Sequence, residues 1–169
     1  MIELKGIAWD HPRGFDPMVK TASLFQKKNP EVQINWDKRP LQAFADRPIE
    51  KMAFEFDLMV IDHPHVGEAS RKNLIYELNQ NKKYEYELLL LEKNSVGLSH
   101  QSYNFNSNQY ALAIDAAAPV SAFRDDLIDN PPTTFDETIK LAEKSKVIWP
   151  IKPVDSISCF NSIAANFDN

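Results

Sequence analysis

Hydrophobic and polar positions follow two different periods along the first part of the chain. Residues 4–9 form a short apolar run of strand type, and residues 16–29 place apolar side chains near helical spacing. Residues 32–36 then alternate apolar with polar side chains. Residues 57–61 (DLMVI) are apolar after the first position, as in a strand buried on both faces. The pattern therefore predicts three strands separated by helical segments.

A second helix is expected between the second and third strands. It would span residues 41–54, and Pro48 would break or restart it. Strands that alternate with helices favour a mostly parallel sheet with right-handed crossovers and helices on both faces. The predicted fold class is α/β with a strand order that starts 2-1-3, so that the first and third strands are neighbours.

The pattern after residue 70 is weaker. A charged segment with an apolar centre predicts a helix at residues 79–94, and the strand-like run QYALAID covers residues 109–115. Thr133 or Thr134 is expected to cap the helix that follows the proline pair at 131–132. The remaining expectations are a short strand or turn at 74–78, a loop at 97–108, an extended piece at 119–124, helices at 135–144 and 155–167, and a strand at 147–151.

The tripeptide Asp-His-Pro occurs twice, each time directly after a predicted strand. It lies in WDHPRG at residues 9–14 and in IDHPHVG at residues 61–67. In open parallel sheets, ligands bind beyond the carboxyl ends of the strands. Each tripeptide alone also fits an architectural role, with Asp as a helix N-cap and Pro shaping a turn. The polar residues expected to share this edge of the sheet are Asp10, His11, Arg13, Asp37, Lys38, Arg39, Asp62, His63 and His65.

Composition limits the functions that this edge can serve. The chain has 169 residues, which fits one domain or one domain plus part of another. Its net charge is −5, and the Lys and Arg residues are scattered along the sequence. A nucleic acid or an anionic membrane surface is therefore not an expected partner, since both are bound by clustered basic residues.

No targeting segment or membrane span is expected. The first residues enter a strand pattern without a basic stretch and a long apolar core, so the chain as written carries no export signal and would be cytoplasmic. The longest leucine run, LLLLE at 88–92, is far shorter than the roughly 18 apolar residues of a membrane helix. The single cysteine, Cys159, permits no internal disulfide and is expected to be a buried, inert thiol.

Four segments occur in an order that resembles a family of transport proteins. FDPMVKTASLFQKKNPEVQINWDK looks like a helix ending in F-x-K-x-N-P before a strand, and DLMVID looks like the strand that follows in that family. YALAIDAAAPVSAFRDDLID and PPTTFDETIKLAEK come later, and the second of these is the most specific match. Together they are similar to the extracellular solute-binding proteins of ABC importers, in the family that includes sugar-binding members.

The resemblance implies a periplasmic-binding-protein-like fold with two lobes and a ligand cleft between them. Residues 1–110 would be the first lobe, 109–115 a hinge strand, and 116–169 the beginning of an incomplete second lobe. Family members have an export signal and more than twice this length, and they work outside the cytoplasm. The implied partners are a small-molecule ligand and, if the protein is exported, the membrane subunits of an ABC importer.

The resemblance also implies that the strand ends of the first lobe face the cleft. It adds Trp9 and Asp115 to the candidate ligand-binding residues. Trp9 and Trp36 are candidate platforms on which a sugar ring could stack. Three histidines and three basic side chains on one edge would also suit an anionic ligand such as a carboxylate or phosphate. The expected ligand is therefore small and polar, either sugar-like or anionic.

Two alternatives to binding without chemistry remain open on the same residues. The first is a metal site in which His11, His63 and His65 act with Asp10 or Asp62. The second is acid–base catalysis by a histidine beside an aspartate, as in the adjacent pair Asp62 and His63. No Gly-rich phosphate loop or cysteine pair indicates a more specific enzyme class, and no cofactor is expected.

Overall fold

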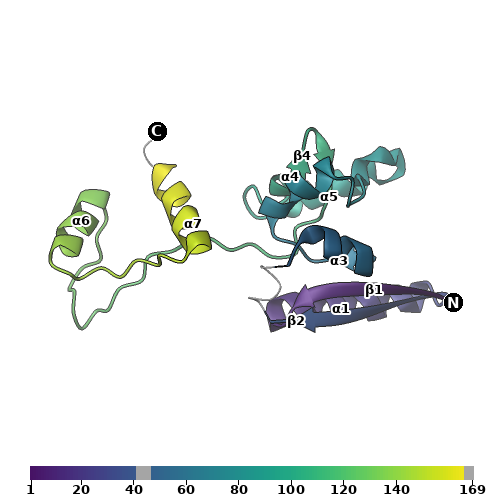
Figure 1. Ribbon diagram of the computed structural model, residues 1–169, viewed down its shortest axis with the longest axis horizontal. Coiled ribbons are helices and arrows are strands. Elements are labelled where there is room, and N and C mark those ends of the chain that lie inside the picture. Colours follow the sequence, from purple (N-terminus) through teal and green to yellow (C-terminus); the bar gives the residue numbers. More distant parts are fainter. Residues whose placement is uncertain (41–46, 166–169) are drawn as a thin grey trace. The chain divides into compact units, whose positions relative to one another are not determined.

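The computed structural model describes residues 1–40 and 47–165. The chain divides into two compact units, Met1–Ala116 and Ala117–Asn169 (Figure 1). Each unit has its own secondary structure, and the candidate edge of the sheet belongs to the first. The division of the chain into a first lobe, a hinge at residues 109–115 and an incomplete second lobe stays a prediction.

The first unit is built on a three-stranded parallel sheet. Its strands are β1 (Ile2–Trp9), β2 (Val32–Arg39) and β3 (Leu58–Met59), in the order β2-β1-β3. The predicted α/β class and the order 2-1-3 are therefore confirmed. The ladder between β1 and β2 runs without a break over eight residue pairs, from Ile2 with Val32 to Trp9 with Arg39.

The third strand is shorter than the apolar run that predicted it. Only Leu58 and Met59 pair with β1, opposite Gly6 and Ile7. Asp57 precedes them and binds Lys5 twice: its N–H donates to the Lys5 carbonyl at 2.9 Å, and its carboxylate accepts from the Lys5 N–H at 2.9 Å. The Lys5 N–H therefore bonds to the Asp57 side chain instead of a backbone carbonyl, and the ladder begins at the next residue, Leu58.

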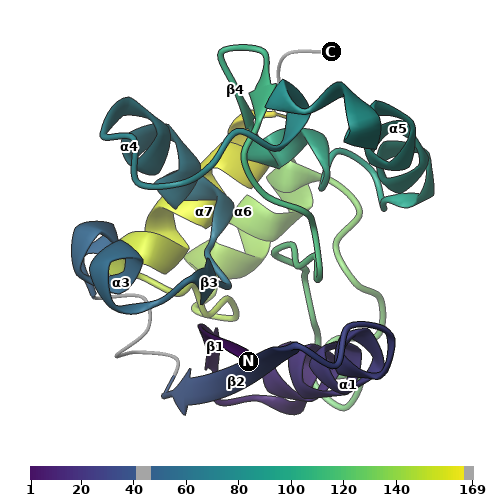
Figure 2. The ribbon, with the colours of Figure 1, turned by 90° about the vertical axis from the view of Figure 1, so that its right-hand side faces the viewer.

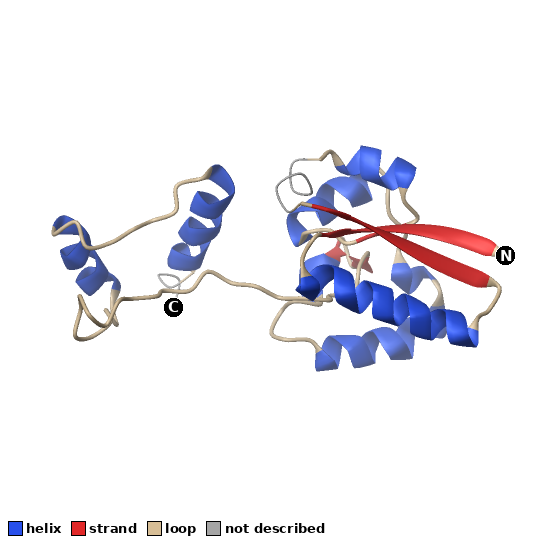
Figure 3. Cartoon of the chain, turned by 90° about the horizontal axis from the view of Figure 1, so that it is seen from below, coloured by secondary structure: helices blue, strands red, loops and turns tan. Residues whose placement is uncertain are grey.

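Helix α1 (Pro12–Lys28) covers one face of β1 and β2 (Figure 3). It begins four residues before the predicted start at residue 16. The segment Pro12 to Gly14, predicted as a break, forms its first turn because proline suits the first helical positions, where no intrahelical N–H bond is needed. Gly14 is buried against the Trp9 ring, so the absence of a side chain lets the helix approach β1 closely.

The core of the first unit lies between α3 (Ile49–Glu55), β3 and α4 (Val66–Arg71) (Figure 2). Pro48 is the N-cap of α3, which agrees with its predicted role as the point where the helix restarts. The earlier part of that predicted helix, residues 41–46, lies outside the described residues. The buried apolar cluster consists of Ile49, Met52, Ile61 and Ala69, with Met59, Leu74, Ile75 and Tyr103 packed against it.

Short elements complete the first unit. They are the 3-10 turns η1 (His63–His65), η2 (Leu78–Gln80), η3 (Lys82–Tyr84) and η4 (Gln101–Tyr103), helix α5 (Glu85–Asn94), and the antiparallel pair β4 (Asn104–Phe105) and β5 (Asn108–Gln109). The helix predicted over 79–94 is confirmed in its second part. The strand predicted over 109–115 is wrong beyond Gln109, and no strand forms over 74–78, because these segments have no partner strand among the described residues.

The side chain of Asn79 joins η2 to the β4–β5 hairpin. Its Nδ2 donates to the Ser107 carbonyl and to Asn108 Oδ1, both at 3.3 Å, and its Oδ1 accepts from the Gln109 N–H at 3.0 Å. These residues lie about thirty positions away along the chain. One amide group therefore holds a hairpin that has only two ladder pairs of its own.

The second unit contains α6 (Phe135–Glu143) and α7 (Pro153–Ala164), and Figure 1 shows both helices. The predicted cap of α6 is confirmed: Thr134 and Glu137 form a capping box. The strand predicted at 147–151 is wrong, since no strand forms in the described part of this unit. Cys159 lies on α7 and is half-buried, so the expectation of a buried thiol is also wrong. Within the described ranges, no helix has the length and apolar character needed to cross a membrane.

Candidate functional site

The carboxyl ends of the parallel strands form one edge, which we call the strand-end edge. It consists of Asp10, His11 and Arg13 after β1, Asp37, Lys38 and Arg39 in β2, and Asp62, His63 and His65 after β3. The β2 residues differ from expectation because they are the last three residues of the strand and do not follow it. The ladder reaches that far because β1 continues to Trp9, and the Asp10 N–H still donates to the Arg39 carbonyl at 2.7 Å.

The basic residues of β2 are held by acidic and aromatic neighbours. Lys38 Nζ lies 2.9 Å from Asp10 Oδ1 and 5.4 Å from the centre of the Phe15 ring. Arg39 lies 3.7 Å from a Glu55 carboxylate oxygen at the end of α3. The cation–π contact with Phe15 adds a modest attraction for the Lys38 ammonium group to that of the Asp10 carboxylate. The two strand-end cations are therefore positioned by contacts within the first unit.

His11 has a structural role at the start of α1. It is the N-cap residue, and its Nδ1 accepts a hydrogen bond from the Arg13 N–H at 3.1 Å. This bond satisfies one of the N–H groups that a helix leaves without an intrahelical partner. The first Asp-His-Pro tripeptide thus starts a helix, with His rather than Asp as the cap.

The second Asp-His-Pro tripeptide starts the 3-10 turn η1. Asp62 precedes the turn without a side-chain cap, and His63 and His65 lie within it. The three histidines are not brought together with acidic groups: among residues 1–40 and 47–165, no three His, Cys, Asp or Glu side chains are grouped so that they could hold a metal ion. The predicted adjacency of the two tripeptides is confirmed at the level of the strands, since β1 pairs with β3.

An ion pair connects the strand-end edge to a distant part of the chain. Arg13 Nη2 lies 3.2 Å from Asp115 Oδ2, and the exposed fractions of the two side chains are 60% and 29%. Asp115 is the next-to-last residue of the first unit, which ends at Ala116. The contact therefore places the segment that leaves the first unit beside the first turn of α1, at the edge predicted from the sequence.

Tyr103 is a polar residue of this region that the sequence did not indicate. Its hydroxyl donates to the Ile61 carbonyl at 3.0 Å. Burial raises the pKa of Tyr103, and the negative charges of Asp62 and Asp115 raise it further. Tyr103 falls in a segment that reads only as a loop, so no periodic pattern marks it.

The basic side chains of the strand-end edge have carboxylate neighbours. Arg13 pairs with Asp115 and Lys38 with Asp10, and Arg39 shares Glu55 with Arg47. These carboxylates reduce the cationic character expected of the edge, which stays a prediction. An edge of paired charges can donate to and accept from hydroxyl groups, and it attracts an anion less strongly than unpaired cations would.

The two candidate aromatic platforms lie in different places. The Trp9 ring packs on Gly14 of α1 and lies at the end of β1. The Trp36 ring packs on Gly6 in the middle of the sheet, so it lies away from the strand ends. Only Trp9 is therefore placed to serve a ligand at the strand-end edge.

Comparisons with known proteins give a likeness of backbone only. No protein-family model matches the sequence, and no curated protein matches it. One similar solved structure is a periplasmic solute binding protein from Pectobacterium atrosepticum, with a TM-score of 0.48 and 17% sequence identity. The match covers 65% of this chain and 26% of that one. The chain therefore spans about a quarter of the length of that protein.

Proposed function

We propose that this chain is the ligand-binding part of a solute-binding protein and holds a small, polar, sugar-like solute at the strand-end edge without converting it. The observation that carries the proposal is the ion pair between Arg13 and Asp115. It brings the Arg13 guanidinium and the Asp115 carboxylate, which are far apart in the sequence, together at the edge where parallel sheets bind ligands.

The chemistry of the edge suits a ligand with several hydroxyl groups. Arg13 offers N–H donors in a planar fork, and Asp115 and Asp62 offer acceptor oxygens. Trp9 adds an aromatic surface at the end of β1, on which the apolar face of a sugar ring can pack. Because the cations are paired, a neutral ligand is favoured over a carboxylate or phosphate.

The position of Asp115 suggests how binding would be coupled to motion in the whole protein. A ligand that accepts a hydrogen bond from Arg13 and donates one to Asp115 would bind the segment that leads out of the first unit. Closure of two lobes around a ligand is a common form of this coupling. Delivery of the solute to an ABC importer in the membrane, after export, belongs to the same proposal.

No described contact favours the metal or acid–base alternatives. The Nδ1 atom of His11 is engaged with the Arg13 N–H, and His63 and His65 lie in one short turn. We therefore propose binding and no second function.

The test is a ligand screen by thermal unfolding on the complete chain. Neutral monosaccharides and disaccharides are compared with dicarboxylates and inorganic phosphate. A bound ligand stabilises the folded state by about 2.7 kcal/mol at a concentration one hundred times its Kd. We expect stabilisation by a neutral sugar, and its loss in Arg13→Ala and in Asp115→Asn.

Arg124→Ala is the matched control, since Arg124 forms an exposed ion pair with Asp126 in the second unit. Exposed ion pairs contribute little to stability, so all three variants should fold. Undiminished stabilisation in Arg13→Ala and Asp115→Asn would refute the proposed site. Conversion of the ligand to a product, detected by mass spectrometry, would refute binding without chemistry.

A further inference from the structure

Strand β2 has a partner strand on one side only. It stands at the end of the order β2-β1-β3, and β1 lies on its inner side. The carbonyls of Glu31 and Arg39 accept from β1 at 2.7 Å, and backbone groups alternate between the two sides of a strand, so the odd-numbered residues bind β1. The N–H and C=O groups of Ile34 and Trp36 therefore point outward. In the part of the chain that the structure describes, no backbone hydrogen bond from outside the sheet reaches them.

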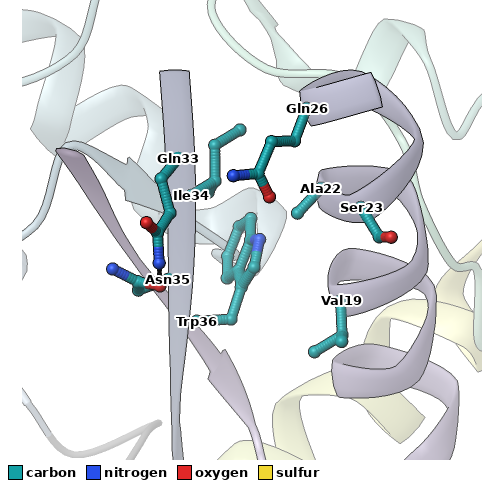
Figure 4. A pocket seen from close by; sticks show the side chains of 8 residues that line it. All are labelled: Val19, Ala22, Ser23, Gln26, Gln33, Ile34, Asn35 and Trp36. Atoms are coloured by element: carbon teal, nitrogen blue, oxygen red, sulfur yellow. Dashed lines mark hydrogen bonds between the residues drawn. The ribbon is translucent and has the colours of Figure 1, made fainter. Parts of the chain in front are cut away.

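The apolar side chains of β2 are also incompletely covered. A hollow of about 340 Å³ lies between β2 and α1. Figure 4 shows Ile34 and Trp36 on the side of β2 that faces α1, and Gln33 and Asn35 on the opposite side. No side chain of β2 is fully buried, although three consecutive residues of β1 are. The sheet therefore leaves both backbone groups and apolar surface open along β2.

An edge strand of this kind can pair with another chain. Its free side presents a row of backbone donors and acceptors, and charged side chains commonly prevent unwanted pairing. β2 ends in three charged residues, Asp37, Lys38 and Arg39. A partner strand must therefore offer suitable side chains opposite these charges.

The outward backbone groups limit how a second copy of β2 can align with the first. In an antiparallel pair, residues that exchange N–H···O bonds must both point towards the partner strand. With a two-fold axis at Asn35, Ile34 lies opposite Trp36 of the second copy, and Trp36 lies opposite Ile34. Pairs of an aromatic with a β-branched side chain stabilise neighbouring strands. Both pairs lie on the side that faces α1, so the second copy would cover the open apolar surface beside the hollow.

The polar side chains on the other side of β2 match in the same register. Glu31 falls opposite Arg39 of the second copy, and opposite charges placed across two strands attract. Gln33 falls opposite Asp37. Gln33 Nε2 donates one hydrogen to Asn35 Oδ1 at 3.0 Å, so its second hydrogen is available to the Asp37 carboxylate.

The neighbouring registers match less well. With the axis at Ile34, Glu31 would face Asp37, and two carboxylates directly opposite each other repel. With the axis at Trp36, Ile34 would face the ammonium side chain of Lys38. The pattern of charged and apolar residues therefore favours the axis at Asn35.

We propose that β2 is an interface at which two copies of this chain pair antiparallel about a two-fold axis at Asn35. Such an interface uses the same surface on both copies. The pairing joins two three-stranded sheets into one, and the strand ends of the two copies point in opposite directions. Both strand-end edges would therefore stay open to a ligand. The inference goes beyond the proposed function and does not depend on it.

The test is disulfide formation by Asn35→Cys in the complete chain. Residue 35 would lie opposite itself in a pair without hydrogen bonds, where Cα atoms are about 4.5 Å apart. A disulfide spans Cα distances of about 4.4–6.8 Å. The native thiol is removed by Cys159→Ser, and the protein is oxidised in a glutathione buffer and followed by non-reducing electrophoresis. We expect a linked dimer with about twice the 19.4 kDa mass of the chain.

Asp37→Cys in the same Cys159→Ser background is the matched control. Residues 35 and 37 are both exposed and lie on the same side of β2. Two copies of residue 37 would be separated by four residues along the paired strands, or about 13 Å, which is too far for a disulfide. Asn35→Cys should therefore form the linked dimer at least about tenfold faster than Asp37→Cys, because a disulfide between two unpaired chains needs a chance collision.

A second measurement leaves the strand without a new cysteine. Sedimentation velocity of the original chain gives the dimer Kd. Glu31→Lys should raise this Kd about tenfold, because two attractive pairs with Arg39 become repulsive. Glu31 is exposed, so the fold should persist. Glu143→Lys makes the same change in net charge on α6 and should leave the Kd unchanged.

Three results would overturn the inference. Equal rates of linking in Asn35→Cys and Asp37→Cys would show that the register is wrong. A dimer whose Kd does not change in Glu31→Lys would place the interface on another surface. A chain that stays monomeric at millimolar concentration would leave β2 to a different partner. The sugar screen on Arg13 and Asp115 variants is independent of all three, so either proposal can fail without the other.

Discussion

Replacement of Gly14 by alanine sets two physical effects against each other in α1. An alanine in place of glycine favours a helix by about 1 kcal/mol. The added Cβ atom would lie 2.4–2.5 Å from three carbons of the Trp9 indole, although ordinary contacts of this kind are 3.4–4 Å. The ring and the helix must therefore separate by about 1 Å, the difference between 3.4 and 2.4 Å.

The steric effect should exceed the gain in helix propensity. Overpacking a buried contact of this type costs about 1–3 kcal/mol. Subtracting the helix gain of about 1 kcal/mol leaves a net loss of about 1 kcal/mol in the free energy of unfolding. Urea unfolding followed by far-ultraviolet circular dichroism measures the change, and an unchanged m-value would show that the unfolded state is not altered.

Gly67→Ala is the matched control because Gly67 also lies in a helix, α4. Its added Cβ atom would lie 3.4 Å from the Phe105 ring, which is an ordinary contact, so the variant should be more stable by about 0.4–1 kcal/mol. In the background of Trp9→Ala, Gly14→Ala should likewise become stabilising. The argument fails if Gly14→Ala stabilises the original chain as much as Gly67→Ala does.

Two further predictions concern ionisable groups. Tyr103→Phe should lower the free energy of unfolding by about 1 kcal/mol, because the Ile61 carbonyl loses its donor. Because the pKa of Tyr103 is raised in the folded state, the unfolded state loses the phenol proton at a lower pH than the folded state does. The free energy of unfolding should therefore fall as the pH rises above about 10. The urea midpoint of Tyr103→Phe should fall less over the same pH range. Hydrogen bonds from the Thr133 N–H and hydroxyl hold the pKa of Glu137 below its usual value. The stabilisation of α6 by the Glu137 carboxylate is therefore present above the unfolded pKa of about 4.3 and is lost as the pH falls through the folded pKa. Circular dichroism should show a loss of helix on acidification of the original chain. Glu137→Gln should not show this loss.

The parts of the fold that follow from local periodicity could be predicted from the sequence. The strands β1 and β2 carry clear apolar patterns, and the capping box of α6 is a local signal within four residues. The segments 109–115 and 147–151 carry equally apolar patterns and form no extended strands. A strand needs a partner along its edge, and that partner is a long-range property that no local window contains.

The candidate site was predictable in position and less so in chemistry. The strand order places the residues after β1 and β3 beside one another, as the repeated tripeptide suggested. The sequence could not show that Asp115 and Glu55 would neutralise Arg13 and Arg39, because those carboxylates come from other elements. Tyr103 was missed because it lies in a segment without a periodic pattern.

The amide of Asn79 makes the first unit sensitive to chemical ageing. Deamidation would replace its Nδ2 donor with an oxygen that can only accept, opposite the Ser107 carbonyl and Asn108 Oδ1. Two attractive contacts would become repulsive, while the bond from the Gln109 N–H would persist. The loss of a single amide nitrogen would then loosen the contacts by which this side chain joins η2 to the β4–β5 hairpin.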